Sequence, residues 1–315
     1  MTIRLLYFST PTFGVPSLRL LARDVRFEVA GVVTRPDRPA GRGLRIAPPP
    51  VKMAALELGL PVLQPSSLRT PEAQAAIRAL EPDVAAVAAY GLWIPADIFD
   101  LPPKRSLNLH PSLLPRHRGA APIPSALLAG DKEVGLSVLF VEDEMDAGDL
   151  LSQLVVPVSD DETSGSIMAS LAGAAAPFFA DTLAAWVAGE IVPQPQDHSQ
   201  ATWIDRMEKG VGRIDWSVPA CELARRCRAL SPWPGCFTFF AGKRLLIHRA
   251  KALPNLLGSP SGAGPGKVVR VGDSVTVATG EGLLVLETVQ LEGRRSLDIH
   301  EFERGQRSFV GARLD

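Results

Sequence analysis

Strand-length apolar runs alternate with helical patterns through the first part of the chain. Residues 4–8 (RLLYF) and 28–33 (EVAGVV) are two such runs, and residues 15–21 between them carry a helical pattern. A second helical pattern at 71–80 precedes the continuous apolar run 83–89 (DVAAVAA), which has the length of a buried strand. This alternation predicts an α/β fold with a Rossmann-like, mostly parallel sheet that is covered by helices on both faces.

The same pattern extends to a long helix that closes the first predicted domain. Three more strand-like runs follow, at residues 106–110, 134–141 and 150–158. Residues 169–187 are rich in Ala and Leu and predict a long helix, and the next stretch is polar and contains two prolines. We therefore predict a domain over residues 1–188 and a linker over residues 189–204.

From residue 205 the pattern changes to short strands separated by turn residues. After a helical pattern at 220–230 come five short runs, at residues 236–240, 244–250, 267–271, 274–279 and 282–291. Evenly spaced short strands over residues 205–315 predict a small β-barrel. We expect an OB-fold-like architecture, the commonest barrel that binds nucleic acids.

Charge changes the picture of this second domain. The formal net charge of the 315 residues is −1, which by itself gives no hint of a polyanionic partner. Residues 1–204, however, carry 16 Lys and Arg against 22 Asp and Glu, a net charge of −6, whereas residues 205–315 carry 17 against 12, a net charge of +5. A basic C-terminal domain is suited to holding the phosphates of a nucleic acid.

Cysteine usage and hydropathy bear on the cell compartment. Three cysteines without a short paired spacing argue against a disulfide framework and against a zinc site, which favours a reducing cytoplasm. The first ten residues hold only a strand-length apolar run, and no stretch reaches the roughly 18 apolar residues of a membrane span. We expect a soluble, unprocessed, cytoplasmic monomer without a membrane contact or a metal.

A polar pair stands at the end of one predicted strand. In SLNLH, the strand period of two places Asn108 and His110 on one face and the two leucines on the other. Open α/β sheets bind ligands at the carboxyl ends of their strands, where this pair lies. Taken alone, the pair is also typical of structural residues whose hydrogen bonds are satisfied within the fold.

The residues around this pair resemble the folate-dependent formyltransferases. The shared pattern is Asn108-x-His110-x-Ser112-Leu113-Leu114-Pro115-x-x-Arg118-Gly119, followed later by Asp146-x-Gly148-Asp149. The resemblance implies that Asn108, His110 and Asp146 form a catalytic trio. Taken alone, the acidic run 142–149 is typical of a solvated loop or, more remotely, of a calcium site, although it lacks the ligand spacing and the distal Glu of an EF-hand loop.

Formyl transfer gives each member of this trio a task. When an amine attacks the formyl carbonyl, the oxygen becomes an oxyanion, which the Asn108 amide and the His110 ring can stabilise. Asp146 either orients His110 and favours its charged form, or accepts the proton shed by the attacking nitrogen. The sequence carries no Gly-x-Ser-x-Gly elbow, and the reaction needs no covalent enzyme intermediate.

The resemblance also implies where the formyl donor, 10-formyltetrahydrofolate, binds. In the family, the flat pteridine ring occupies a slot that involves the loop after the strand at 83–89 and the acidic loop. The candidate donor-binding residues are Tyr90, Gly91, Leu92, Ile94, Ser112, Leu113, Pro115 and Asp143. An ordinary strand-to-helix turn is the alternative for residues 90–92.

A basic loop at residues 34–45 (TRPDRPAGRGLR) indicates the acceptor. It resembles the loop with which formyltransferases that act on initiator methionyl-tRNA reach the acceptor stem, and by that analogy Arg42 probes the acceptor end. Its glycines and prolines predict mobility without a fixed secondary structure, and its arginines offer phosphate contacts. The candidate tRNA-binding residues are Arg35, Arg38, Arg42, Arg45, Lys209 and Arg213. We expect the formyl group to pass to the amino group of methionine on initiator tRNA.

Two other functions remain compatible with the trio. One is a formyltransferase that acts on an amino sugar or a purine-pathway amine, and the other is an RNA-binding protein on a decayed enzyme scaffold. The intact trio argues against decay, and the arginine-rich loop with the basic C-terminal domain argues against a small acceptor. Departures from the family pattern at Ser9, Thr12 and Pro124-Ser125 leave the edge of the substrate pocket open.

Overall fold

The structure of the chain is a computed structural model that describes residues 2–40, 45–253 and 264–315. Its contacts divide the chain into two compact units. The first unit comprises Met1–Pro122, Glu133–Pro157 and Met168–Ile204. The second unit comprises Ile123–Lys132, Val158–Ile167 and Asp205–Asp315. Each unit is built around a sheet of its own.

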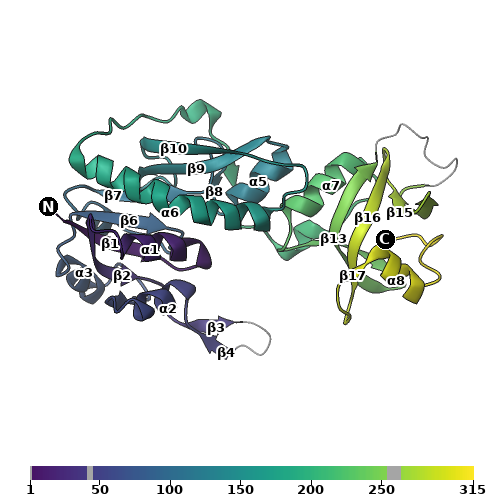
Figure 1. Cartoon of the computed structure of the whole chain (residues 1–315), viewed down its shortest axis with the longest axis horizontal. Coiled ribbons are helices and arrows are strands. Elements are labelled where there is room, and N and C mark those ends of the chain that lie inside the picture. The colour runs from purple at the N-terminus through teal and green to yellow at the C-terminus, as the bar shows by residue number, and fades with distance from the viewer. Residues whose placement is uncertain (1, 41–44, 254–263) are drawn as a thin grey trace. The chain divides into compact units, whose positions relative to one another are not determined.

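A seven-stranded sheet in the order β10-β9-β7-β6-β1-β2-β5 forms the centre of the first unit (Figure 1). Its strands are β1 (Ile3–Ser9), β2 (Phe27–Val33), β5 (Val62–Leu63), β6 (Val84–Ala88), β7 (Ser106–His110), β9 (Glu133–Phe140) and β10 (Leu150–Pro157). The first five are parallel, and β9 runs antiparallel to β7 and to β10. Parallel strands covered on both faces need no polar alternation, and β6 is accordingly buried at every position.

Helices cover both faces of this sheet. They are α1 (Val15–Leu21), α2 (Pro50–Glu57), α3 (Pro71–Arg78), α4 (Ala96–Phe99) and α6 (Ser164–Ala188). Because side chains alternate along β1, Leu6 and Phe8 pack in one core cluster with Ile77 of α3. Tyr7 points to the other face, where its hydroxyl donates to the Gly14 carbonyl just before α1.

Helix α6 runs across the sheet (Figure 1). Among the described residues it is the helix whose length and hydropathy are sufficient for a membrane span, and 44% of its most apolar stretch is buried within the fold. Its Trp186 stacks edge-on against Phe140 with 5.0 Å between ring centroids, and the indole nitrogen donates to the Lys104 carbonyl at 2.7 Å. The apolar character of α6 therefore follows from its packing on the sheet.

The second unit contains a separate antiparallel sheet in the order β12-β13-β16-β15-β14, with β17 paired to β16. Its elements are α5 (Pro122–Ala129), α7 (Ala220–Ala229), β12 (Cys236–Phe240), β13 (Lys243–Leu253), β14 (Val268–Val271), β15 (Ser274–Ala278), β16 (Leu283–Leu291), β17 (Leu297–Asp298) and α8 (Ile299–Gly305). Three rings, Phe240, Phe302 and Phe309, meet edge-on in its core. The predicted fold class, a mostly parallel α/β sheet followed by a separate β domain, is confirmed.

The basic segment that we expected to lack fixed secondary structure forms a short antiparallel ribbon where the structure describes it. Strand β3 (Arg38–Ala40) pairs with β4 (Arg45–Ala47), and residues 41–44 lie outside the described residues. The base of the ribbon is held by Asp37, which accepts hydrogen bonds from Lys52 at 2.8 Å and from Gln64 at 2.7 Å. The local composition does not reveal these ties, which hold the segment just before β3.

Candidate active site

The carboxyl ends of three neighbouring strands meet at one edge of the first sheet. Ser9 at the end of β1 pairs with Ala88 at the end of β6, and Val87 of β6 pairs with Asn108 of β7. His110 ends β7 two residues later, with its side chain 7% exposed. Because the register aligns the strand ends, the loops that follow β1, β6 and β7 leave the sheet at the same edge. Open α/β sheets bind ligands at this edge.

The predicted trio comes together at this edge. Asp146 lies in the loop between β9 and β10, and its Oδ1 accepts a hydrogen bond from Asn108 Nδ2 at 3.2 Å. Its Oδ2 accepts from the Gly119 backbone N–H at 3.0 Å and lies 3.6 Å from His110 Nδ1. The Asp146 side chain is only 9% exposed. A carboxylate from a distant loop therefore contacts both polar residues of the strand end.

His110 lies between two hydrogen-bond acceptors. Its Nε2 is 3.1 Å from the His117 carbonyl oxygen, and its Nδ1 faces the Asp146 carboxylate. A proton on either ring nitrogen therefore has an acceptor. The Asn108 amide gives one N–H to Asp146, which leaves its second N–H for a substrate oxygen.

The loop that carries the family motif after β7 is shaped by a buried serine. The Ser137 hydroxyl of β9 donates to the Ser112 carbonyl at 2.6 Å and accepts from the Leu114 N–H at 3.1 Å. Gln153 of β10 reaches the same hydroxyl and the Leu114 carbonyl, both at 2.9 Å. The predicted donor residue Ser112 is buried, and its hydroxyl donates to the Arg116 carbonyl at 2.9 Å. Its side chain thus shapes the loop.

The predicted donor-binding residues, several of which lie in the loop after β6, differ in how far they are buried. Tyr90 is 2% exposed, packs edge-on against Phe8 of the core and accepts a hydrogen bond from Thr10 at its carbonyl oxygen. Burial raises the pKa of its phenol to about 12, partly offset by the nearby Arg35 charge. The other predicted donor positions range from buried to exposed: Ile94 is buried, Leu92, Leu113 and Pro115 are half-buried, and Gly91 and Asp143 are exposed.

The predicted tRNA-binding residues that the structure describes belong to both units. Arg38 and Arg45 project from the ribbon as exposed side chains, and Arg42 lies outside the described residues. Arg35 is half-buried beside the loop after β6, where a Cβ added to Gly91 would lie 3.4 Å from its Nη1. Lys209 and Arg213 are exposed in the second unit.

Three residues near the site have partners that the sequence analysis did not identify. They are Arg118, Gln196 and Thr202, and the last two lie in the predicted linker. Thr202 accepts a hydrogen bond from the His117 N–H at 2.8 Å. Arg118 belongs to the family motif, which could have marked it, whereas nothing in the local pattern distinguishes Gln196.

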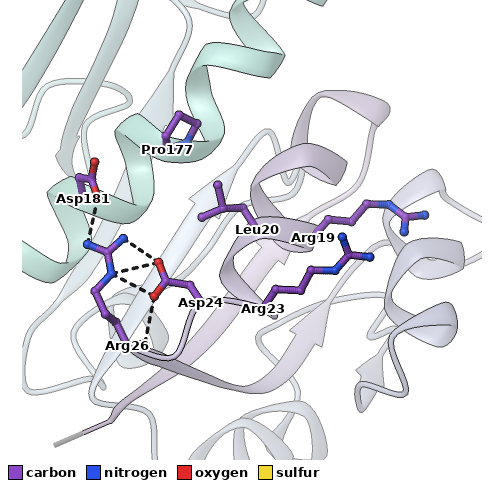
Figure 2. Close-up of a pocket in the computed structure, with 7 residues that line it drawn as sticks. All are labelled: Arg19, Leu20, Arg23, Asp24, Arg26, Pro177 and Asp181. Atoms are coloured by element: carbon purple, nitrogen blue, oxygen red, sulfur yellow. Dashed lines mark hydrogen bonds and ion pairs between the residues drawn. The ribbon is translucent and has the colours of Figure 1, made fainter.

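Figure 2 shows a pocket in the first unit whose lining includes none of the predicted site residues. Its lining residues are Arg19, Leu20, Arg23, Asp24, Arg26, Pro177 and Asp181. Arg26, which directly precedes the amino end of β2, pairs with Asp24 at 2.6 Å and with Asp181 of α6 at 2.9 Å. The Arg26 guanidinium holds the pKa of the Asp24 carboxyl below its usual range. These pairs connect the turn before β2 to α6.

Across the described ranges, no three His, Cys, Asp or Glu side chains are grouped so that they could hold a metal ion. The polar groups of the predicted trio are one amide, one imidazole and one carboxylate, together with the backbone N–H and C=O groups that contact them. These groups can donate hydrogen bonds to a developing oxyanion and accept a proton beside it.

Comparisons with known protein families and proteins agree on one family. The formyl transferase family model matches residues 4–183, and the model of the formyl transferase C-terminal domain matches residues 206–307. The methionyl-tRNA formyltransferase of Roseiflexus castenholzii is 45% identical over 100% of this chain and 99% of its own. That of Myxococcus xanthus is 42% identical over 98% and 97%, respectively.

Solved structures share the fold at low identity. The HypX protein of Aquifex aeolicus in complex with tetrahydrofolic acid superposes with a TM-score of 0.62 at 19% identity, over 98% of this chain and 48% of its own. An N-formyltransferase of Helicobacter canadensis in complex with folinic acid and dTDP-3-aminofucose has a TM-score of 0.67 at 12% identity, over 91% and 98%.

Proposed function

The chain belongs to the formyl transferase family, and on that premise we propose that it transfers the formyl group of 10-formyltetrahydrofolate to the amino group of methionine on initiator tRNA. The observation that carries this proposal is the contact of Asp146 with both Asn108 and His110 at the carboxyl edge of the sheet. Relatives at 40–45% identity over nearly the whole chain are named methionyl-tRNA formyltransferases, which supports the choice of acceptor.

The trio performs the transfer in a single addition and collapse. The methionine nitrogen attacks the formyl carbon, and the second N–H of Asn108 stabilises the oxyanion that forms. Asp146, with His110 beside its Oδ2, accepts the proton that the attacking nitrogen sheds. The carbon–nitrogen bond to the folate then breaks, the folate nitrogen takes up a proton, and tetrahydrofolate leaves. No side chain is acylated in this sequence.

The donor occupies the slot between the loop after β6 and the acidic loop before Asp146. Gly91 and Leu92 offer backbone groups to the pteridine edge, because the Tyr90 side chain is buried in the core. The remaining predicted donor-binding residues are Asp143, Ile94, Ser112, Leu113 and Pro115, the last three of which lie in the motif loop. The likeness of the fold to proteins solved with tetrahydrofolic acid and with folinic acid supports a folate at this edge.

Exposed cations bind the tRNA. The arginines of the ribbon reach the acceptor stem, Arg42 probes the acceptor end by analogy with the family, and the C-terminal unit with Lys209 and Arg213 contacts the phosphates of the tRNA body. The net charge of +5 over residues 205–315 supports this division of labour. The protein acts as a cytoplasmic monomer without a metal or a membrane, and α6 serves as a core helix.

One acceptor competition tests the proposal. The purified chain is given 10-formyltetrahydrofolate with methionine-charged initiator tRNA, methionine-charged elongator tRNA, glycinamide ribonucleotide or a dTDP-linked amino sugar, and formyl transfer is measured for each. We expect the highest kcat/KM on initiator tRNA. Preferred formylation of the nucleotide or the sugar would assign the chain to another branch of the family.

A further inference from the structure

The segment that follows α6 doubles back onto the active site of the first unit. Gln194 forms a two-way backbone bridge with Leu150, at the start of β10. Further along, β11 (Trp203–Ile204) pairs in parallel with β8 (Arg118–Gly119), the end of the family motif. Residues 196–204, which the sequence places in the predicted linker, therefore lie against the loop of Asp146 and the end of the family motif.

Gln196 is the buried centre of this segment. Its amide nitrogen donates to the Asp146 carbonyl at 2.9 Å and to the Gly148 carbonyl at 2.7 Å, and the residue is only 6% exposed. Its amide oxygen accepts from Arg118 Nη2 at 2.8 Å. Both N–H groups and the oxygen of the amide are thus used, so only a side chain with this donor and acceptor arrangement satisfies all three partners.

Arg118 carries a charge into the same buried position. The residue is 1% exposed, and besides Gln196 its guanidinium contacts His198 Nδ1 at 3.1 Å and Glu144 Oε1 at 3.3 Å. The ring of Trp203 lies 5.4 Å from it. A buried charge is tolerated when it is paired and hydrogen-bonded, and these contacts supply partners for Nη1 and Nη2, whereas the buried Nε has no partner among the described residues.

These contacts close a ring around the proposed proton acceptor. The backbone of Asp146 is held by Gln196, Gln196 is held by Arg118, and the next residue, Gly119, donates its N–H to the Asp146 carboxylate. Asp146 has a φ of +54°, in the left-handed region, which Asp adopts more readily than most residues other than glycine but which still costs it energy relative to the right-handed region. The ring constrains both the backbone and the side chain of Asp146.

We propose that Arg118 and Gln196 are positioning residues, which hold Asp146 in the strained conformation that aims its carboxylate at Asn108 and His110. The inference rests on the proposed function, since it assigns these two residues to the same transfer reaction. Neither touches the substrate, so their contribution passes through Asp146. Misplacement of a catalytic group by about 1 Å costs on the order of a hundredfold in rate, so the expected effect is large.

The first test replaces the amide without changing its size. Gln196→Met should lower kcat for formyl transfer roughly 10- to 100-fold, the scale seen when a partner of a functional ligand is removed, and should leave KM for donor and tRNA nearly unchanged. The control is Gln194→Met, the same change at an exposed glutamine of the same segment, whose side-chain amide donates to the nearby Val192 carbonyl. Equal kcat values for the two variants would overturn the proposal.

A double-mutant cycle separates positioning from general damage. If Gln196 acts through Asp146, the Gln196→Met change should cost almost nothing further in kcat in an Asp146→Ala background. A full, additive loss in that background would overturn the proposal. If Gln196→Met does not fold, Gln196→Glu takes its place in the cycle, because a glutamate retains the acceptor for Arg118 and removes both donors to the loop.

Hydrogen exchange tests the ring without any activity. The Gly119 amide donates to Asp146, so its exchange should be faster in Gln196→Met than in wild type and unchanged in Gln194→Met. Unchanged exchange in Gln196→Met would overturn the proposal even if kcat fell. A wild-type chain that fails to formylate initiator tRNA would refute the proposed function, whereas the exchange comparison would still decide whether these residues hold Asp146.

Discussion

The candidate active site and the arginine ribbon use polar side chains in opposite ways. At the active site, His110 and Asp146 are less than a tenth exposed, and each has a partner within the fold. On the ribbon, Arg38 and Arg45 are exposed on a two-stranded element that is held at its base by Asp37. On the proposed roles, bond-making would take place among groups whose geometry is set before substrate arrives, whereas tRNA would be bound by exposed groups that can adjust.

The dielectric surroundings explain this division. Buried hydrogen bonds act in a medium of low dielectric constant, where a well-aimed donor stabilises a developing charge strongly and its loss is costly. Exposed cations act through water and salt, so each contributes modestly and their sum depends on ionic strength. Substitutions at the site should therefore reduce kcat steeply, and substitutions on the ribbon should change KM and its salt dependence.

Removal of the His110 ring should have the largest effect. His110→Ala deletes the group that lies between Asp146 and the His117 carbonyl, and kcat should fall roughly 10²- to 10⁴-fold, the scale of a lost acid–base or oxyanion group. Donor affinity, measured by folate binding at equilibrium, should fall much less. The matched control is His300→Ala, at an exposed histidine of the second unit. Near-native turnover of His110→Ala would exclude this histidine from the chemistry.

A single methyl group at Gly119 should have the next largest effect. Gly119 has a φ of +103°, and an added Cβ would lie 2.3 Å from the Ile204 carbonyl oxygen. Gly119→Ala should therefore separate β8 from β11, cost roughly 1–3 kcal/mol of unfolding free energy, and lower kcat because Asp146 loses a hydrogen bond.

Gly59→Ala is the matched control for this methyl group. Gly59 also has a positive φ, +69°, but apart from its chain neighbours no heavy atom of the described residues lies within 4 Å of its added Cβ. It should cost about 1 kcal/mol of unfolding free energy from backbone strain and leave kcat unchanged. Thermal unfolding together with turnover separates the two variants. Equal kcat losses in both would show that backbone strain alone, at any position, disturbs the site.

Much of the fold could be predicted from the sequence, because local patterns determine its parallel strands. The continuous apolar run at residues 83–89 predicts a strand covered on both faces, and β6 has that environment. Asn108 and His110 were placed at a strand end by the period of two, and the structure has them there. Their catalytic role stays a prediction, which the His110→Ala variant tests.

Long-range contacts explain what the sequence could not reveal. The bond from Gln196 to Asp146 spans 50 residues, and a glutamine between prolines and polar residues carries no pattern of its own. The same holds for the ribbon at residues 38–47, which composition predicts to be irregular but which pairs because Asp37 is held by Lys52 and Gln64. Tyr90 was predicted at the donor slot, yet its ring belongs to the core.

Paired charge removals should have a smaller effect and should distinguish two surfaces. Arg38→Ala with Arg45→Ala removes two exposed cations of the ribbon, and Lys209→Ala with Arg213→Ala removes two of the second unit. Each pair should raise KM for tRNA with little change in kcat. The slope of log affinity against log salt should decrease by about 0.7–0.9 for each phosphate that the protein no longer neutralises. The ribbon pair should also weaken the preference for initiator over elongator tRNA.

The two pairs serve as controls for each other, because each removes two charges from the same protein. If only charge mattered, both pairs would weaken initiator and elongator tRNA equally. If KM and the salt slope stayed at wild-type values for the second-unit pair, Lys209 and Arg213 would have no part in tRNA binding, and the charge of residues 205–315 would need another explanation.

The smallest effect is expected at Tyr90, where a buried hydroxyl lies close to the site without a hydrogen-bond partner among the described residues. At neutral pH, Tyr90→Phe should change the unfolding free energy by no more than about 1 kcal/mol, because the removed group forms no bond there. Alkaline pH should reveal a difference in unfolding free energy between wild type and Tyr90→Phe. Burial raises the pKa of the folded phenol to about 12, above the roughly 10 of an unfolded tyrosine, so the folded state retains the proton longer. Wild-type stability should therefore fall as pH rises between these two values, by about 1.4 kcal/mol per pH unit, and the Tyr90→Phe variant should lack this contribution. Urea unfolding of both proteins at pH 7 and pH 11 measures it. Parallel losses in the two proteins would mean that the Tyr90 phenol ionises as freely in the folded state as in the unfolded chain.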